Sequence, residues 1–308
     1  RVARNIAYVA QLGDCVDTAS DITQWERANT SLKLLENAVT TGFVDGLPYG
    51  IAVGNHDQSP DGSADGNSTR LYNQYFGTTR FRNRSYYGGR QSSNHDNHYQ
   101  LFSASGLDFI VLDLEYDTTP DAAILQWANN LLKTYSQRRA IVVTHYALNL
   151  DATFSPQGRA IYDALKDNPN FFLMLCGHVT GESRRQDVWA GRTVYTLMSD
   201  YQGWANGGNG WMRWLEFSPA NNQLRVKTYS PVLNQYKTDT NSQFTLLYDQ
   251  QGSGFAPLRT DVNVAAGTVS SARWAGLRPN TEYEWYVKVS DGLTTTISPK
   301  WRFKTGAN

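Results

Sequence analysis

Residues 47–57 read LPYGIAVGNHD, a short apolar run followed by a glycine and then by three polar side chains in succession. Apolar runs of this length that are bounded by glycine are typical of buried strands. A run that ends in a glycine or threonine and then a polar residue recurs in NIAYVAQLGD (5–14), RAIVVTH (139–145) and FFLMLCGH (171–178). The sequence therefore predicts four short strands, each with a polar side chain just beyond its C-terminal end.

Amphipathic helices are predicted between these strands. In the first, the side chains of Trp25, Ala28 and Leu32 share one helical face, and Asp21 is a plausible N-cap. Helices and strands that alternate along the chain, followed by a β-rich end, are typical of an α/β layered domain. The predicted helices are 21–39, 120–136 and 158–168; the further strands are a hairpin within 97–117 and antiparallel strands between 192 and 231.

Composition excludes some classes of protein. The chain has 308 residues, and its 28 basic side chains balance its 28 acidic ones, so no basic surplus indicates a nucleic-acid partner. No apolar segment approaches the ~20 residues of a membrane helix. Charged residues make up 18% of the chain, below the roughly 25% of typical soluble domains. Since polar uncharged residues fill the difference, we expect a secreted or cell-surface protein.

Two domains are expected. Composition shifts within 239–257, and the Gly/Ser/Gln stretch at 250–254 is the predicted linker. We therefore assign residues 1–240 to the α/β domain and residues 250–308 to a small all-β domain. The chain opens on a sequence that reads as the middle of a domain, so we expect that a first strand is missing upstream.

The four strand ends are expected to converge. In an open α/β sheet, sites form beyond the carboxyl ends of the strands, which would bring Asp14, Asn55, His56, His145 and His178 to one edge. A lone histidine at a strand end is usually only a hydrogen-bonded polar residue. Imidazole, carboxylate and amide groups together suit Zn, Fe, Mn or Ni. We therefore predict a site for a divalent or trivalent transition metal.

The motifs GDCVD, GNHD, TH and GH, in that order, resemble those of the calcineurin-like metallophosphoesterases. The resemblance covers roughly residues 1–237. It implies a fold with two mixed sheets packed as a sandwich and flanked by helices, with metal ions at the strand C-termini. It also implies hydrolysis of phosphate esters, as a phosphomonoesterase or phosphodiesterase, with a small-molecule or polymeric substrate.

The resemblance implies four metal ligands. Asp14 would bridge two metal ions, and Asn55, His145 and His178 would complete the shell of the second ion. A bound metal lowers the pKa of water from 15.7 to about 7, so that hydroxide is available as the nucleophile at neutral pH.

The resemblance also implies two catalytic residues. His56 would contact the phosphoryl oxygen or protonate the leaving group, which contributes typically ~10²–10⁴-fold to the rate. Asp57 would orient and acidify the imidazole of His56.

The sequence departs from the family pattern at the first metal. Only 13 residues precede Asp14, and none of them forms the family's opening Asp-x-His motif. Thr180 stands where the family's Gly-His-x-His has its second histidine. Asp17 could approach this position or cap the following helix. Truncation, a modified first site and a single-metal protein all remain open, although truncation alone does not explain Thr180.

Four other polar residues each allow a functional and a structural interpretation. His95 and His98 lie in the irregular segment 58–98, where we expect substrate specificity; they could shape a substrate pocket or simply pack. Arg184 and Arg185 could reach a phosphate or lie in a solvated turn.

The tail resembles a fibronectin type III module. LRPNTEYEWYVKVSDG at 277–292 matches the segment that leads into its tyrosine corner, and WRFKTG at 301–306 its last strand. Two functions remain open for the whole chain. The first is a metal-dependent phosphoester hydrolase. The alternative is a degenerate, catalytically weak or inactive secreted binding or structural protein of the same fold.

Overall fold

The computed structural model describes six stretches of the chain and divides it into two compact units. The first unit comprises Arg1–Glu216 and Leu224–Leu246, and the second comprises Phe217–Gln223 and Leu247–Asn308. The predicted linker, apart from Gln250, lies outside the described residues. The described stretches are 5–59, 68–250, 258–277, 279–290, 295–299 and 301–307.

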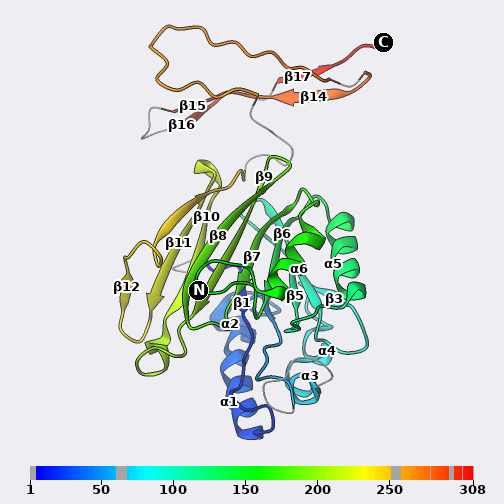
Figure 1. The fold of residues 1–308 in the computed structure, drawn as a ribbon, viewed down its shortest axis with the longest axis vertical. Helices are drawn as coiled ribbons and strands as arrows, with labels where there is room; N and C mark the ends of the chain where they lie inside the picture. The colour runs from blue at the N-terminus through cyan, green and yellow to red at the C-terminus, as the bar shows by residue number, and fades with distance from the viewer. Residues whose placement is uncertain are drawn as a thin grey trace. The chain divides into compact units, whose positions relative to one another are not determined.

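A seven-stranded mixed sheet forms the centre of the first unit (Figure 1). Strands β5, β6, β7 and β9 are parallel to one another, so their C-terminal ends meet at one edge of the sheet. Strands β3 and β4 extend the sheet beyond β5, and β8 pairs with β9, all antiparallel. In spatial order the strands are β3 (Tyr87–Arg90), β4 (His98–Ala104), β5 (Leu107–Leu114), β6 (Arg139–Thr144), β7 (Phe171–Cys176), β9 (Arg192–Asp200) and β8 (Gly181–Trp189).

Two smaller sheets complete the first unit. Strands β1 (Val9–Gln11) and β2 (Tyr49–Ile51) pair in parallel with Gln11 opposite Ile51, so they end level with each other. The other sheet has four strands, in which β11 pairs with β10, β12 and β13. These strands are β10 (Met212–Ser218), β11 (Gln223–Ser230), β12 (Gln235–Lys237) and β13 (Phe244–Leu247).

Helices α5 (Ala122–Thr134) and α6 (Pro156–Leu165) pack against the large sheet and bury its main apolar cluster. Leu132 and Ile161 from the helices and Val142 from β6 are fully buried in this cluster. Full burial of such a side chain contributes about 1.5–3 kcal/mol. Figure 1 shows both helices beside β5 and β6. The predicted α/β domain is therefore confirmed, as a large mixed sheet flanked by helices.

A second apolar cluster joins β2 to three helices. Helices α1 (Ile22–Lys33), α3 (Arg70–Phe76) and α4 (Thr78–Phe81) bury aromatic side chains against Tyr49 and Ile51. Two of these helices and strand β3 lie within 58–98, where no periodicity was recognised. Each of them has at most seven residues, too few for a periodic pattern to stand out.

The helix predicted over 21–39 is interrupted. Asp21 caps α1 as predicted, since its side chain accepts a hydrogen bond from Thr23 N. After the 3₁₀ turn η2 (Leu34–Glu36), Asn37 takes an extended conformation, and its Oδ1 accepts from Val39 N and Thr40 N at the start of α2 (Ala38–Thr41). An asparagine that caps its own downstream backbone ends one helix and begins another. Val39 is consequently 93% exposed instead of buried.

The second unit contains two antiparallel pairs among its described residues. Strand β14 (Glu282–Trp285) pairs with β17 (Trp301–Lys304), and β15 (Lys288–Ser290) pairs with β16 (Thr295–Ile297). The run TVSSARWAGL (268–277) reads as a strand in the sequence, but its described backbone is irregular. Trp274 in this segment packs edge-on against Tyr283, with ring centroids 5.1 Å apart.

Candidate functional site

The four strand ends meet at one edge, where side chains pair across the strands. Asp14 and Asn55 follow β1 and β2, and His145 and His178 follow β6 and β7. Asp14 Oδ2 lies 3.1 Å from His145 Nε2, and Asn55 Oδ1 lies 3.0 Å from His178 Nδ1. The two imidazole rings meet edge-on with centroids 4.9 Å apart.

Backbone geometry makes this close approach possible. A Cβ at Gly13 would collide with the His145 ring, and a Cβ at Gly54 would collide with the Asp14 carboxylate. Gly13 also has φ of 100°, a region that L side chains rarely adopt. Asp14 and His178 themselves have positive φ, 55° and 68°. Non-glycine residues are uncommon in this region and concentrate at functional positions.

The hydrogen bond made by His145 Nδ1 leaves Nε2 facing a carboxylate oxygen. Nδ1 lies 2.8 Å from Leu12 O, so it donates to that carbonyl and Nε2 carries the lone pair of the neutral ring. Nε2 is buried without a hydrogen bond and faces Asp14 Oδ2. Two acceptors at this distance require a proton or a cation between them.

The pKa values of this pair shift in the directions expected for two facing acceptors. Burial opposes protonation of His145, but Asp14 and the Leu12 carbonyl outweigh it and raise the pKa of the imidazole. Burial also opposes ionisation of Asp14, whereas His145 and the His56 backbone amide favour it and lower the pKa of the carboxyl group. The carboxylate therefore stays ionised, as a metal ligand requires.

The surroundings of His178 favour the neutral form of its imidazole. Burial and the nearby His145 lower the pKa of His178 to about 4. At neutral pH its ring therefore carries no charge, which is the form that binds metals.

The predicted ligands have donor types that suit a transition metal, but the described residues do not gather them into a metal-holding group. No group of three or more His, Cys, Asp or Glu side chains in a metal-holding arrangement occurs among the residues that the structure describes. The predicted set has two imidazoles, one carboxylate and one amide, a mixture that suits Zn, Fe, Mn or Ni. At the position of the family's further histidine, Thr180 packs against Gly203, where a Cβ would approach Thr180 Oγ1 within 2.7 Å.

His56 is fixed beside Asp14. Its backbone amide donates to Asp14 Oδ1 at 3.0 Å, and its Nδ1 donates to Asp17 O at 2.8 Å. The ring is partly exposed, and Nε2 remains available for a substrate. This arrangement fits the predicted contact with a phosphoryl oxygen or a leaving group.

The predicted role of Asp57 is wrong. Asp57 Oδ2 accepts from Gly54 N at 2.8 Å and Oδ1 accepts from Val16 N at 3.3 Å, whereas the His56 ring is held by Asp17 O. Burial raises the pKa of Asp57 to about 7. Asp57 therefore holds the backbone that follows β2 in place. Sequence adjacency to His56 suggested a partnership that the folded chain does not make.

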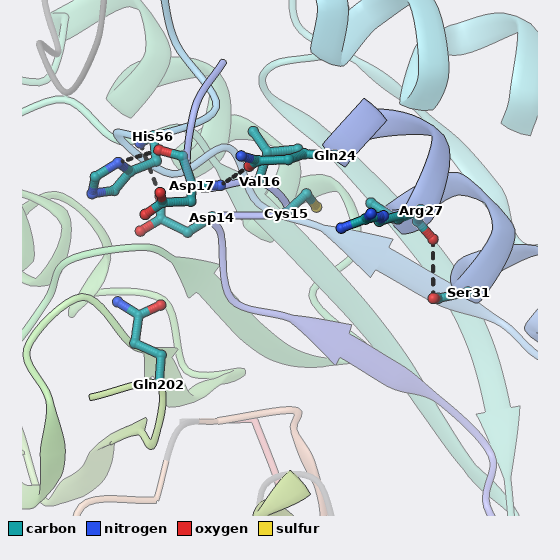
Figure 2. Close-up of a pocket in the computed structure, with 10 residues that line it drawn as sticks. Asp14, Cys15, Val16, Asp17, Gln24, Arg27, Ser31, His56 and Gln202 are labelled. Atoms are coloured by element: carbon teal, nitrogen blue, oxygen red, sulfur yellow. Dashed lines mark hydrogen bonds between the residues drawn. The ribbon is translucent and has the colours of Figure 1, made fainter. Parts of the chain in front are cut away.

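Two cavities flank Asp14, with volumes of about 330 Å³ and about 270 Å³. The larger contains His56 and the residues of α1 that Figure 2 shows, and the smaller contains His145 and His178. Asp14 and Gln202 line both cavities.

Asp200 is a site residue that sequence reasoning missed. It lies at the end of β9, lines the smaller cavity with Asp14 and accepts from Gln202 N at 3.0 Å. Burial raises the pKa of its carboxyl group. The run RTVYTLMS (192–199) predicts a strand that stops one residue short of Asp200, a polar strand end like the other four. Asp200 would have been predicted if the search for a polar residue at the end of each strand had included β9.

The remaining polar residues that the sequence analysis singled out make structural contacts. His95 and His98 are fully buried, and their stacked rings have centroids 3.8 Å apart. Neither residue lines either cavity, so both serve packing, which was the structural alternative. Arg184 lies over the Phe244 ring, and Arg185 pairs with Asp187 on β8. Asp17 does not cap α1, because Asp21 does.

Gly54→Ala is expected to disturb the site. The added methyl group has no room beside Asp14, so we expect a loss of about 1–3 kcal/mol in stability together with weaker metal binding. Thermal unfolding and metal titration measure the two effects. Gly177→Ala is the matched control, since the nearest atom to its added Cβ lies 3.7 Å away. Equal behaviour of the two variants would contradict the steric argument.

Comparison with known proteins extends these observations. No family model matches the chain. The uncharacterized protein YvnB of Bacillus subtilis is 35% identical over 331 aligned positions, which cover 98% of this chain. The chain spans 24% of the length of that relative.

A dimetal phosphatase from Danio rerio superposes with a TM-score of 0.53, covering 79% of this chain and 84% of that one at 12% identity. The fold resembles that of a dimetal phosphatase. This likeness shows the fold alone, and it agrees with the fold that the motifs GDCVD, GNHD, TH and GH predicted. Across the described parts of the chain, no helix combines the length and apolarity that a membrane span requires.

Proposed function

We propose that the chain is a metal-dependent hydrolase of phosphate esters. The observation that supports this most directly is the facing pair of buried acceptors, His145 Nε2 and Asp14 Oδ2, which needs a cation or a proton between its atoms. The fold likeness to a dimetal phosphatase agrees with the same reading.

Asp14, Asn55, His145 and His178 would hold the metal ion. A bound transition metal polarises a phosphoryl group and acidifies water. The chain itself contributes rigid placement. Leu12 O fixes the His145 ring, and the His56 amide fixes one oxygen of Asp14, so these two donor groups are held in place before a cation binds. Such preorganisation by neighbouring groups strengthens metal binding.

His56 would act on the substrate. Because Nδ1 donates to Asp17 O, a protonated ring presents Nε2–H as its second donor. That donor can bind a phosphoryl oxygen or pass a proton to the departing alkoxide. The partly exposed position of the ring at the edge of the larger cavity gives a substrate access to it.

His56→Ala tests this role. We expect kcat/KM for an aryl phosphate to fall by roughly 10³-fold, because the variant lacks the proton donor but keeps all four candidate metal ligands. Metal content should stay at the wild-type value, which elemental analysis of the purified protein measures. Loss of metal together with activity would show that His56 supports the metal site instead.

The replacement at position 180 favours a second candidate function. With Thr180 in place of a histidine, the chain could be a catalytically weak binding or structural protein of the same fold. Purified chain that takes up no Mn, Fe, Zn or Ni and hydrolyses no aryl phosphate would favour this candidate. One equivalent of metal with turnover that depends on His56 would exclude it.

The second unit supports a proposal about location. We propose that it is a fibronectin type III-like module and that the protein acts outside the cell or at its surface. The antiparallel β14–β17 pair and the mutual packing of the Trp274, Tyr283 and Phe303 rings support the module. Recovery of the native protein in the cytosolic fraction alone would contradict the location, and backbone NMR assignments without a sandwich would contradict the module.

A further inference from the structure

The larger cavity carries a recognition element beyond the candidate metal ligands. It has a volume of about 330 Å³, within the range of pockets that bind small molecules. Asp14 and His56 lie on one side of the residues drawn in Figure 2, and Arg27 and Ser31 on the other. A ligand that fills the cavity would therefore reach from the candidate site to helix α1.

One face of α1 lines this cavity. Arg27 and Ala28 lie three and four residues after Gln24, and Ser31 lies four after Arg27, so these residues share one face of the helix. Trp25 lies outside this set and is fully buried in the apolar cluster. The packing of α1 on one face thus directs its polar residues into the cavity.

Gln24 is fixed as a hydrogen-bond donor. Its Oε1 accepts from Asp17 N at 2.7 Å and from Thr18 N at 3.0 Å. These two backbone donors settle which end of the amide is oxygen, so Nε2 is left to donate elsewhere. The same loop holds His56 through Asp17 O. The amide of Gln24 and the imidazole of His56 are therefore anchored to one segment of backbone.

Arg27 is the cation of this cavity. Among the residues that line it, Arg27 is the one Lys or Arg side chain, and within the described part of the chain it forms no ion pair. Arg27 is an exposed residue, and Figure 2 shows its side chain directed toward Cys15 and Gln24. A guanidinium group with a neighbouring amide donor is suited to carboxylate or phosphate oxygens.

We propose that this face of α1 recognises a second anionic group on the substrate. The inference rests on the proposed function, which places the phosphate ester at Asp14 and His56. The substrate class is then a small phosphate ester whose leaving group carries a carboxylate or a second phosphate. Arg27 binds that group, and Gln24 Nε2 donates a further hydrogen bond to it. The carboxylate of Asp17 lines the same cavity, so selectivity depends on the anion reaching Arg27.

The test compares two ligands that differ by one anionic group. Phenylphosphonate and para-carboxyphenylphosphonate are titrated into the full chain by calorimetry, because neither can be hydrolysed. The proposal expects the carboxylate to increase affinity about tenfold in the wild type. Arg27→Ala should abolish this ratio, and Arg27→Lys should retain part of it. Lys33→Ala deletes a positive charge from the same helix outside the cavity, and it should leave the ratio unchanged.

Three results would overturn the proposal. The same ratio of affinities in the wild type and in Arg27→Ala overturns it, as does failure of both phosphonates to bind. If Lys33→Ala also lost the affinity ratio, the effect would come from the overall positive charge of the helix and not from contact with Arg27. That result would overturn the proposal too. Failure of the proposed function is a separate result: metal-loaded protein then hydrolyses neither phenyl phosphate nor its para-carboxy analogue, while the affinity ratio of the phosphonates still depends on Arg27.

Discussion

Asp14→Asn is expected to lower kcat/KM for an aryl phosphate by about 10⁴-fold or more, and to reduce the metal content of the purified protein from one equivalent toward zero. The carboxylate supplies the negative charge that faces His145, and an amide of the same shape cannot replace it. Asparagine Oδ1 can still accept from the His56 amide, so the fold around the site should persist. Steady-state kinetics and elemental analysis measure both effects.

Asp163→Asn serves as the matched control for this prediction. Asp163 is a partly exposed carboxylate on α6 that pairs with Arg159 and Lys166, and it lines neither of the two cavities. Its variant should keep wild-type metal content and activity. If Asp14→Asn behaved like Asp163→Asn, the proposed metal site would have to be abandoned.

Glu182→Ala is expected to cause the largest loss of stability. Glu182 Oε1 accepts hydrogen bonds from Tyr201, Arg213 and Thr228, and Oε2 accepts one from Ser242. Arg213 and Glu182 are each 6% exposed. Removing one partner of a buried pair leaves the other charge uncompensated, which costs about 3–5 kcal/mol. For a unit of this size the melting temperature should fall by roughly 10 °C.

A surface ion pair provides the comparison. Glu216 pairs with Arg225 at 3.1 Å and with Lys227 at 2.6 Å, but its side chain is 45% exposed. Glu216→Ala should cost less than about 1 kcal/mol. Thermal unfolding of the two variants at equal protein concentration tests the contrast. Similar losses would mean that burial of the Glu182 pair is not what stabilises the fold.

The pH dependence of stability gives a second readout on Glu182. Burial opposes its ionisation, but Ser242, Tyr201 and Arg213 outweigh burial and lower its pKa below the ordinary 4.5. The stabilisation is therefore complete above pH 4.5 and is lost as the pH falls through the lowered pKa of the folded state. In Glu182→Ala this part of the acid-induced loss should be absent.

Much of the scaffold could be predicted because its signals are local. The apolar run RAIVVT gave strand β6 as Arg139–Thr144, and the Ser105-Gly106 turn gave the hairpin of β4 and β5. Asp21 was recognisable as a helix cap because an N-cap requires a side-chain acceptor at a single position. Such features depend on a few neighbouring residues, which a sequence displays directly.

The parts that could not be predicted depend on contacts between distant segments. Asp57 was paired with the adjacent His56, whereas it accepts from Val16 N, 41 residues away in the sequence. Arg27 was not predicted as a site residue, because an arginine on an amphipathic helix usually faces water. The cavity beside it forms only when α1 lies against the loop after β1. The roles of the candidate ligands remain predictions that metal binding has to test.

The left-handed backbone at Asp14 and His178 has a consequence for engineering. A non-glycine residue in that conformation costs roughly 1–3 kcal/mol, and glycine would remove much of this cost. Both positions would therefore be attractive targets in a screen that rewarded heat resistance alone. Such a screen would replace two candidate metal ligands with glycine, so selection for stability on this scaffold should keep Asp14 and His178 unchanged.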